Sequence, residues 1–417
     1  MGFLLRELKA AKKAGIHRVL RKAARISSLG LAVFPLILIR LIRPLVLVRF
    51  QEMISSRIAP YVGEADTYLS EHDAGIHQDR GFDIYYNQSI VCNDQLKKMW
   101  DRSLRVWQFT EPIGRLNALI PGGKAHTIPW VHRQDRDIFG ILQKTTPHIN
   151  FTAEEETAGQ EGLHEIGVSQ GAPFVCLHAR DSVYLSTFFP SLDKHRFEYR
   201  DSTIGNYLPA AEELARRGYF VIRMGHLVNQ PLKSSNPMII DYASNGRTDF
   251  LDIYLSSRCA FFICTTSGLE KVPMTFRRPC AYVNYLPLDH LPTWGPKDLC
   301  ISKRLWQRDE GRYLTLEEII SSDIAIFNHM DLYEENGIEV VENSPEEITD
   351  LVIEMDERLN GTWETPVEDE ELQNHFWSLY KNSDIQASPR GALSAEVMFS
   401  RAGASFLRQN RDLAKVI

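Results

Sequence analysis

The sequence has few cysteines and lacks the short signatures of several large enzyme classes. Its six cysteines are scattered over 417 residues without a CxxC pair, so neither a zinc knuckle nor a disulfide framework is expected. Most of them lie in apolar runs, where a reduced thiol behaves as a small hydrophobic side chain, which favours a reducing compartment. An HExxH motif and a P-loop are also absent, which argues against the corresponding zinc proteases and nucleotidases.

Low-complexity runs, internal repeats and long linkers are absent as well. Apolar residues make up 44% of the chain and charged residues 24%, which indicates a folded protein rather than a disordered or fibrous one. The length allows a substantial core and favours two domains over one.

Charge is divided unevenly along the chain. The first 50 residues contain eleven Lys and Arg against one acidic residue, Glu7, and carry a net charge of +10. The other 36 bases and 53 acids give the rest of the chain a net charge of -17, although the total is only -7. Because nucleic-acid-binding domains are basic, the acidic body argues against a nucleic-acid partner.

The N-terminal arm has the pattern of a segment that associates with a membrane. Residues 4–20 place apolar side chains at roughly helical spacing among bases, which is typical of an amphipathic helix on anionic lipid. Residues 29–48 are long enough to cross a bilayer, but two prolines, Arg40 and Arg43 interrupt them. The two arginines would cost about 5–7 kcal/mol near mid-span, so we expect a monotopic or re-entrant segment. A true span and a buried hairpin are the alternatives, and a cleaved signal peptide does not fit because the apolar core begins too late.

Past residue 80, short apolar runs alternate with helix-period segments, which is typical of βα units and a parallel sheet. A first series comprises a strand at 82–87, a helix at 94–104 and further runs at 105–109 and 114–120. A second series places strands at 174–178, 219–224, 260–264 and 280–285.

The expected helices have recognisable ends. Thr152 caps a helix that runs to Ile166, and residues 206–218 form a crossover helix that ends at Gly218. Thr315 and Ser344 begin further helices in the acidic tail, and residues 364–371 read as a solvated loop. The expected parts are a membrane-associating segment, two Rossmann-like domains and closing helices, over residues 1–50, 51–165, 166–345 and 346–417.

Polar residues follow two of the expected strands, where open parallel sheets bind their ligands. His178, Arg180 and Asp181 come at the end of strand 174–178. Arginine can hold a diphosphate with two hydrogen bonds, and His or Asp can move a proton. A structural Arg–Asp pair at the strand end is the alternative interpretation.

The second polar segment is Thr265, Thr266, Ser267 and Gly268, which follows strand 260–264. Hydroxyls and backbone N–H groups at the start of a helix bind anions, and glycine lets a phosphate approach the backbone. An ordinary helix cap is the alternative.

Two further residues lie near these segments in the expected fold. Arg200 precedes the crossover helix and could point toward the same sheet edge, although a surface ion pair is equally compatible with its position. Asp252 lies with Asp249 at the start of a short helix over 250–257. Either carboxylate could cap that helix or accept a hydrogen bond from a ribose or a base.

The order of these features resembles the donor half of GT-B fucosyltransferases of the α1,6 and protein-O type. The features are, in sequence, the His-x-Arg segment, the crossover helix, Asp252 and the cluster Cys264-Thr265-x-Ser267. Residues 200–225, 337–348 and 401–410 look like a bacterial family of glycosyltransferases of surface-polysaccharide clusters. The resemblance covers roughly residues 55–417. It implies an α/β, GT-B-like fold in which two Rossmann-like domains face a cleft.

The resemblance also implies roles for single residues. Arg180 would contact the donor diphosphate, residues 265–268 would supply further phosphate donors, and Asp252 would face the nucleoside. His178 and Asp181 would lie at the sugar or the phosphate. Basic residues follow the His-x-Arg segment in the fucosyltransferases, whereas Asp181 follows it here, which leaves the identity of the sugar open.

Gly63 would lie in a loop that faces the cleft from the N-terminal half. No DxD occurs in the setting that a GT-A enzyme would use, so neither a metal site nor a cofactor is expected.

We therefore expect a metal-independent glycosyltransferase that transfers a sugar from a nucleotide-sugar donor to a lipid-linked or polysaccharide acceptor in surface-glycan synthesis. Arg180, Arg200 and residues 265–268 would stabilise the leaving diphosphate, and His178 or Asp181 would be the base. The expected location is the cytoplasmic face of a bacterial inner membrane. The alternatives are a nucleotide-sugar epimerase or hydrolase on the same scaffold and a non-catalytic, membrane-bound scaffold for glycan assembly.

Overall fold

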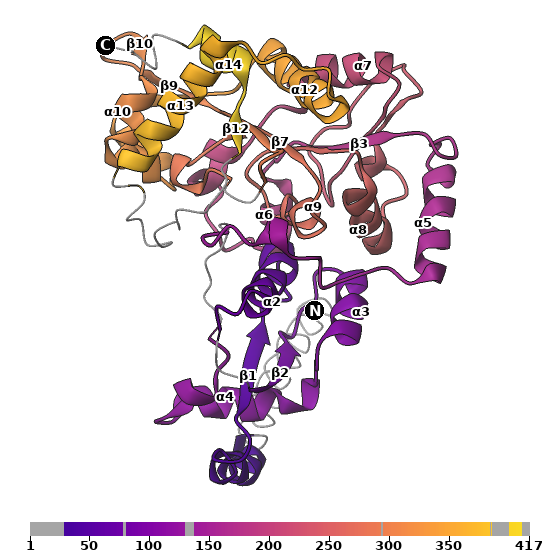
Figure 1. The fold of residues 1–417 in the computed structure, drawn as a ribbon, viewed down its shortest axis with the longest axis vertical. Helices are drawn as coiled ribbons and strands as arrows, with labels where there is room; N and C mark the ends of the chain where they lie inside the picture. The colour runs from indigo at the N-terminus through magenta and orange to yellow at the C-terminus, as the bar shows by residue number, and fades with distance from the viewer. Residues whose placement is uncertain are drawn as a thin grey trace, which may run out of the picture. The chain divides into compact units, whose positions relative to one another are not determined.

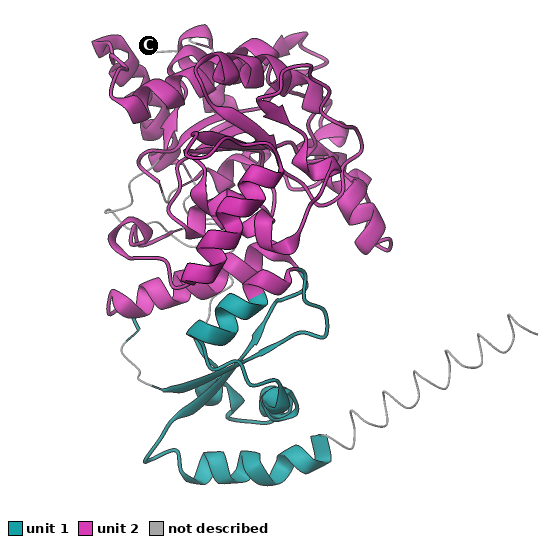
Figure 2. Cartoon of the chain, turned by 90° about the vertical axis from the view of Figure 1, so that its right-hand side faces the viewer, with its two compact units in different colours: residues 1–56, 77–92, 97–131 teal, residues 57–76, 93–96, 132–417 magenta. Residues whose placement is uncertain are grey.

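The structure is a computed structural model. It describes residues 29–77, 81–129, 137–292, 295–383, 385 and 400–410. The basic segment 4–20, expected to form an amphipathic helix, lies outside the described residues. The chain divides into two compact units, unit 1 with residues 1–56, 77–92 and 97–131, and unit 2 with residues 57–76, 93–96 and 132–417 (Figure 2). The four-part division at residues 50, 165 and 345 stays a prediction.

Unit 1 contains a helix over residues 29–41 and a parallel pair of strands. β1 (Val48–Met53) pairs with β2 (Phe82–Asn87) over the whole length of both strands. Buried Val48, Phe50, Ile84 and Tyr86 form its core, and Ile39 of the helix packs against it. In the part of the chain that the structure describes, no helix has both the length and the apolar character needed to cross a membrane.

The remaining elements of unit 1 are short. They are η2 (Gln108–Thr110), α4 (Glu111–Leu119) and η3 (Gly123–His126), and α3 (Asp94–Ser103) runs from unit 2 into unit 1. The expected strand at 82–87 and helix at 94–104 are confirmed, but the run at 105–109 makes only one bridge, from Val106 to Tyr85. Among the described residues, unit 1 thus has a smaller parallel sheet than a complete Rossmann-like domain would contain.

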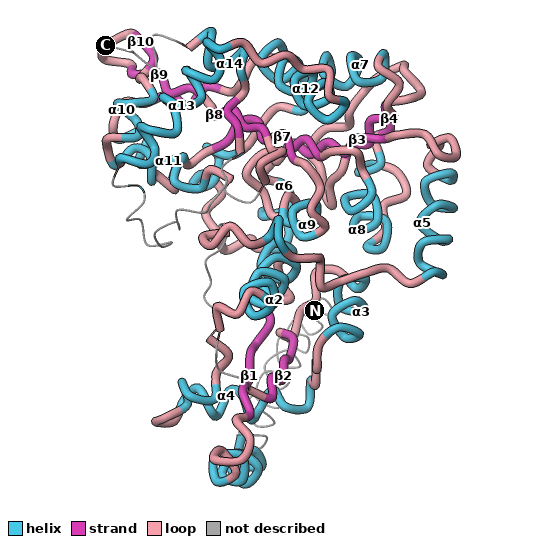
Figure 3. The backbone as a smooth tube through the Cα atoms, in the orientation of Figure 1, coloured by secondary structure: helices cyan, strands magenta, loops and turns pink. Residues whose placement is uncertain are grey.

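Unit 2 is built on a seven-stranded parallel sheet in the order β12-β8-β7-β6-β3-β4-β5 (Figures 1 and 3). The strands are β3 (Phe174–His178), β4 (Phe220–Arg223), β5 (Ile239–Ile240), β6 (Phe262–Cys264), β7 (Cys280–Tyr285), β8 (Leu299–Ser302) and β12 (Arg401–Ala402). After β3, the next two strands of the chain, β4 and β5, lie on one side of β3 in the sheet, and β6 pairs with its other side. The boundary between β3 and β6 is therefore the topological switch point of the sheet, where open α/β folds bind ligands.

The four strands expected in this half are confirmed, two of them with the same bounds. Val175, Cys176 and Leu177 of β3 and Ile263 of β6 are fully buried, because both faces of the sheet are covered and its strands are apolar without alternation. Helices α7, α12 and α14 lie on one face and α8 and α9 on the other (Figure 1). All six cysteines are free thiols, and five of them are buried.

Helices and short helical turns make up most of the rest of unit 2. They are η1 (Pro60–Glu64), α2 (Ala65–Asp73), η4 (Leu142–Lys144), α5 (Ala153–Glu165), α6 (Val183–Phe188), η5 (His195–Arg200), η6 (Ile204–Tyr207), α7 (Leu208–Arg216), η7 (Tyr242–Ser244), α8 (Asp249–Arg258), α9 (Lys271–Thr275), η8 (Leu288–His290), α10 (Leu316–Ile320), η9 (Asp323–Ile326), α11 (Met330–Glu335), α12 (Pro345–Asn360), α13 (Val367–Asn382) and α14 (Ala404–Gln409). A small antiparallel sheet adds β9 (Arg304–Gln307), β10 (Arg312–Tyr313) and β11 (Ile338–Val341).

The expected helix caps are confirmed. Thr152, Thr315 and Ser344 each form a capping box with the glutamate three residues later. Gly218 follows α7 at φ +95°, a conformation that favours glycine. The solvated loop expected at residues 364–371 is wrong beyond Pro366, because α13 begins at the next residue and its acidic first turn interacts favourably with the helix dipole.

Gly159 lets α5 approach α8 closely. A Cβ at this position would collide with the ring of buried Tyr254. We therefore expect Gly159→Ala to destabilise the protein by about 1–3 kcal/mol through overpacking, although alanine is the better helix former. Denaturant unfolding would measure the loss. Gly205→Ala is the matched control, because nothing lies within 4 Å of its added Cβ, and an equal loss in both variants would contradict the packing argument.

Candidate functional site

The two predicted polar segments meet at the switch point. The last residues of β3 and β6, His178 and Cys264, are partners in the register of the sheet. The backbone N–H of Arg180 donates to Oγ1 of Thr265 at 3.3 Å, and Oγ of Ser267 lies 3.3 Å from Nδ1 of His178. Parallel pairing of β3 with β6 thus joins side chains that are about ninety residues apart in sequence.

Arg180 is the central cation of this edge and is 8% exposed. Its Nη1 forms an ion pair with Asp201 and donates to the carbonyl of Phe197 at 3.2 Å. Its Nη2 is buried and has no hydrogen-bond partner among the described residues. The alternative of a structural Arg–Asp pair therefore holds in part, with Asp201 rather than Asp181 as the partner, and one buried donor remains available for a ligand.

Arg200 adds positive charge at the same place. Its guanidinium lies over the ring of Phe197 at 5.1 Å, and its buried Nε has no partner in the described structure. Burial and the nearby charge of Arg200 lower the pKa of Arg180 to about 9. The carboxylates of Asp201 and Asp181 offset part of the repulsion between these two cations, and a bound anion would relieve it further.

Two more cations of this edge were not predicted from the sequence. Lys303 follows β8, is buried, and donates from Nζ to the carbonyl of Asp201 at 2.5 Å. Burial lowers its pKa to about 8, and Arg180 adds to the effect while Glu342 opposes it. The signal for Lys303 was its position directly after a strand, but that strand was not among those expected.

Arg223 is the second missed cation and ends β4. Its Nη1 donates to the carbonyl of Gln230 at 2.7 Å and to Asp241 at 3.2 Å, while its buried Nε lacks a partner in the part of the chain described. Arg223 lies inside the strand expected at 219–224. An arginine in an otherwise apolar, buried strand is unusual, and this was the signal that could have identified it.

His178 is neutral at physiological pH in this environment. Burial, and then the charges of Arg223 and Arg180, lower its pKa to about 3. An anion bound beside the arginines would offset their charge and raise the pKa, so the histidine would become a better proton acceptor when a phosphate is present.

Asp181 is engaged by the backbone. Its carboxylate accepts hydrogen bonds from the N–H groups of Val183 at 3.0 Å and Asn229 at 2.8 Å. It thus holds the start of α6 and the loop after β4. These two bonds give it a structural function that the sequence did not indicate and leave His178 as the better-placed base.

The Thr265–Gly268 segment is mostly structural. Thr266 is buried, and its hydroxyl donates to the carbonyl of Leu286 at 2.9 Å. A Cβ on Gly268 would lie 3.1 Å from Cγ2 of Ile58, so glycine permits a close contact here. The expected helix start directly after Gly268 is wrong, because α9 begins at Lys271 and is only five residues long. The anion-binding contribution of a long helix dipole is therefore missing.

Asp252 lies in the first turn of α8 and is buried within the protein's own polar network. It accepts a hydrogen bond from the Tyr242 hydroxyl at 3.0 Å and pairs with Arg247 at 2.6 Å. Burial raises its pKa to about 7, although Arg247 opposes the shift. The cap of α8 is Thr248, so neither aspartate of this turn caps it, and a nucleoside contact for Asp252 stays a prediction.

Gly63 lies within η1 rather than in the expected loop. It belongs to unit 2, where an added Cβ would be 3.6 Å from Cε of Met274 and 3.7 Å from Cβ of Lys271. These are ordinary van der Waals distances, so the packing of η1 on α9 does not by itself require a glycine here.

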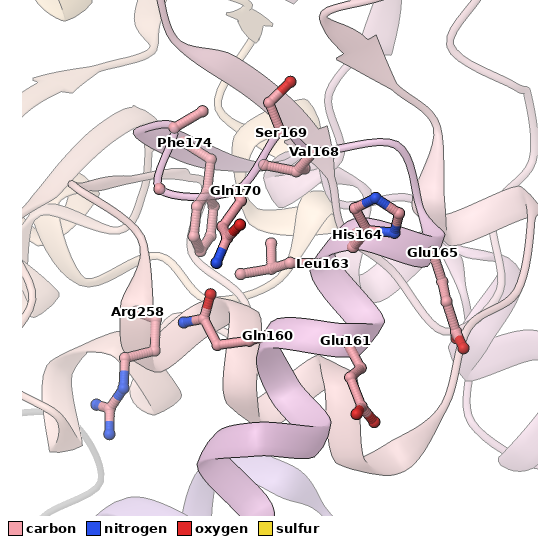
Figure 4. Close-up of a pocket in the computed structure, with 12 residues that line it drawn as sticks. Gln160, Glu161, Leu163, His164, Glu165, Val168, Ser169, Gln170, Phe174 and Arg258 are labelled. Atoms are coloured by element: carbon pink, nitrogen blue, oxygen red, sulfur yellow. The ribbon is translucent and has the colours of Figure 1, made fainter.

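A pocket of about 590 Å³ lies elsewhere in unit 2 (Figure 4). Its lining includes Gln160, His164, Gln170 and Arg258, and none of the predicted site residues. It also includes Phe174, the first residue of β3, so the pocket is at the amino ends of the strands. The carboxyl edge with its unpaired arginine donors remains the better ligand site.

No family model and no curated protein matches the sequence. The chain is similar to the solved structure of a glycosyl transferase of family 9 from Veillonella parvula, with 10% identity over 57% of this chain and 80% of that one, and a TM-score of 0.35. The resemblance to fucosyltransferases therefore gains no support from sequence comparison.

Proposed function

We propose that the protein is a glycosyltransferase that binds the diphosphate of a nucleotide-sugar donor at the carboxyl edge of β3 and β6. The observation that carries the proposal is the buried Nη2 of Arg180, which has no partner among the described residues and lies at the switch point. An unpaired buried guanidinium donor is costly unless a ligand uses it. The neighbouring charges of Arg200 and Lys303 favour an anionic ligand.

The positively charged side chains at this edge of the sheet suit a reaction in which a nucleoside diphosphate is the leaving group. The acceptor hydroxyl attacks the anomeric carbon, the bond from that carbon to the diphosphate oxygen breaks, and the nucleoside diphosphate leaves with the electron pair. Arg180, Lys303 and Arg200 stabilise the negative charge that develops on the leaving group. The neutral imidazole of His178 takes the proton of the acceptor. Because three side chains supply the positive charge, the proposed mechanism does not require a divalent ion.

Two further parts of the proposal concern the domain arrangement and the acceptor. A GT-B arrangement of two Rossmann-like domains stays a prediction, as does a lipid-linked or polysaccharide acceptor in surface-glycan synthesis. An epimerase or hydrolase that attacks the anomeric centre with a carboxylate is less well supported, because Asp181 is engaged by two backbone N–H groups.

Attachment to the cytoplasmic face of a membrane is also part of the proposal. The helix at 29–41 exposes a broad apolar face to solvent. Of its residues, only Ala32 and Leu36 are buried. The exposed apolar side chains of this helix and the turn after it are Leu31, Val33, Phe34, Ile37, Leu38, Leu41, Leu45 and Val46. Such a patch favours insertion into the headgroup region, and the basic residues before and after it favour anionic lipid.

A thermal-shift experiment tests the donor assignment. The full-length protein is titrated with GDP, UDP, CDP and CMP, and we expect one nucleoside diphosphate to stabilise it by about 2.7 kcal/mol at a hundredfold excess over its Kd. CMP should have a smaller effect, because one phosphate cannot engage all the cations. Equal stabilisation by all four, or by none of them, would contradict a specific diphosphate site.

A further inference from the structure

A second cluster of chemically active side chains lies where η5 meets α11 in unit 2. Nε2 of His195 is 3.4 Å from Oδ1 of Asp331 and 3.2 Å from Oε2 of Glu334. Nδ1 of the same ring is 2.9 Å from Oε2 of Glu198. One imidazole is therefore surrounded by three carboxylates, and the ligand atoms of His195, Asp331 and Glu334 all lie within 4.8 Å of one another.

When the imidazole of His195 is neutral, this arrangement places one ring nitrogen in electrostatic repulsion with neighbouring carboxylates. A neutral imidazole carries one N–H, which Glu198 would hold on Nδ1, so a lone pair on Nε2 would face two carboxylates. A cation between the three groups turns this repulsion into coordination. A carboxylate that fixes the second ring nitrogen is a regular feature of metal-bound histidines.

We propose that His195, Asp331 and Glu334 bind one divalent transition-metal ion, with Zn²⁺ as the best fit, and that Glu198 orients the imidazole. One nitrogen and two carboxylate oxygens suit Zn²⁺ and its first-row neighbours, whereas Ca²⁺ and Mg²⁺ prefer oxygen ligands throughout. The three ligands are partly exposed, with side-chain exposures of 39%, 52% and 46%, so water can complete the coordination.

The two elements that supply the ligands are already packed together. The rings of Tyr199 on η5 and Tyr333 on α11 lie 5.7 Å apart, and both residues are buried. The site is thus largely formed before a metal arrives, and binding needs little additional ordering. Because η5 also carries Arg200 and the carbonyl that Arg180 contacts, a bound ion would hold this part of the cationic edge more rigidly.

Direct metal binding tests the inference without reference to any donor or transfer activity. The full-length protein, freed of metal with a chelator, is titrated with Zn²⁺ alone by calorimetry, and Co²⁺ absorption reports the ligand set. We expect one tight site. His195→Gln and Glu334→Gln should each weaken it at least about 100-fold, and Glu198→Gln about 10- to 100-fold.

Glu335→Gln is the matched control, because this residue is on the same short helix and outside the cluster. It should bind Zn²⁺ as the unaltered protein does. Circular dichroism and melting of the metal-free variants separate lost coordination from misfolding. The inference is wrong if the unaltered protein does not bind Zn²⁺ tightly. It is also wrong if the folded His195→Gln variant binds Zn²⁺ as strongly as the unaltered protein.

Discussion

Replacing Arg180 with alanine is expected to remove the stabilisation that a nucleoside diphosphate gives this protein. Hydrogen bonds to charged groups contribute about 1.5–3 kcal/mol each, so losing one such contact should weaken nucleotide binding about 10- to 100-fold. If the diphosphate is also the leaving group, loss of a preorganised cation should lower the transfer rate about 10²- to 10³-fold. Thermal-shift titration measures the first effect, and donor-dependent transfer or donor hydrolysis measures the second.

Arg180→Lys separates charge from geometry. A lysine keeps the positive charge near Asp201 but cannot pair with Asp201 through one nitrogen while it donates to a diphosphate from another, so we expect intermediate binding. Arg312→Ala is the control for loss of an arginine, since Arg312 forms exposed ion pairs with Glu310 and Glu318. If the folded Arg180→Ala variant binds nucleotide as strongly as the Arg312→Ala variant, the proposed donor site is ruled out.

Truncating Arg180 also leaves Asp201 without its ion-pair partner. Some loss of stability is therefore expected in the absence of nucleotide, and the melting temperature of the free variant must be measured first. A nucleotide effect is counted only as the difference between the free and saturated states of the same variant.

The second large effect is expected on membrane binding. The double variant Phe34→Ser and Leu41→Ser removes two apolar side chains that are 77% and 72% exposed. Each should contribute about 1.5 kcal/mol on insertion into lipid, so binding to vesicles that contain anionic lipid should weaken about 100-fold. Co-sedimentation with such vesicles measures the loss. The fold should be unaffected, because both side chains already face solvent.

Val367→Ser is the matched control for this variant. Val367 is equally exposed, at 77%, but it begins α13 in unit 2. It should leave vesicle binding unchanged. Point substitutions are preferable to removal of residues 1–50, because such a deletion would also remove Val48 and Phe50 from β1 and from the core of unit 1. Undiminished sedimentation of the double variant would show that this helix is not the attachment surface.

Local features of the fold could be predicted because they depend on neighbouring residues. The buried strands at 174–178 and 280–285 were recognisable as continuous apolar runs. Thr152 and Ser344 were recognisable as caps because their partners are three residues away. The loop expected at 364–371 failed because the tail buries part of this acidic segment, including Asp369.

The sequence by itself determined that polar groups follow β3 and β6, because strand and loop are adjacent in the chain. Only the tertiary structure decided which of these groups remain available to a ligand. Asp181 is engaged by Asn229, 48 residues away, and Arg180 pairs with Asp201, while Lys303 reaches the same edge from β8. The physical reason is that hydrogen bonds and charge interactions act through space, so strand order and crossover connections select the partners of each side chain.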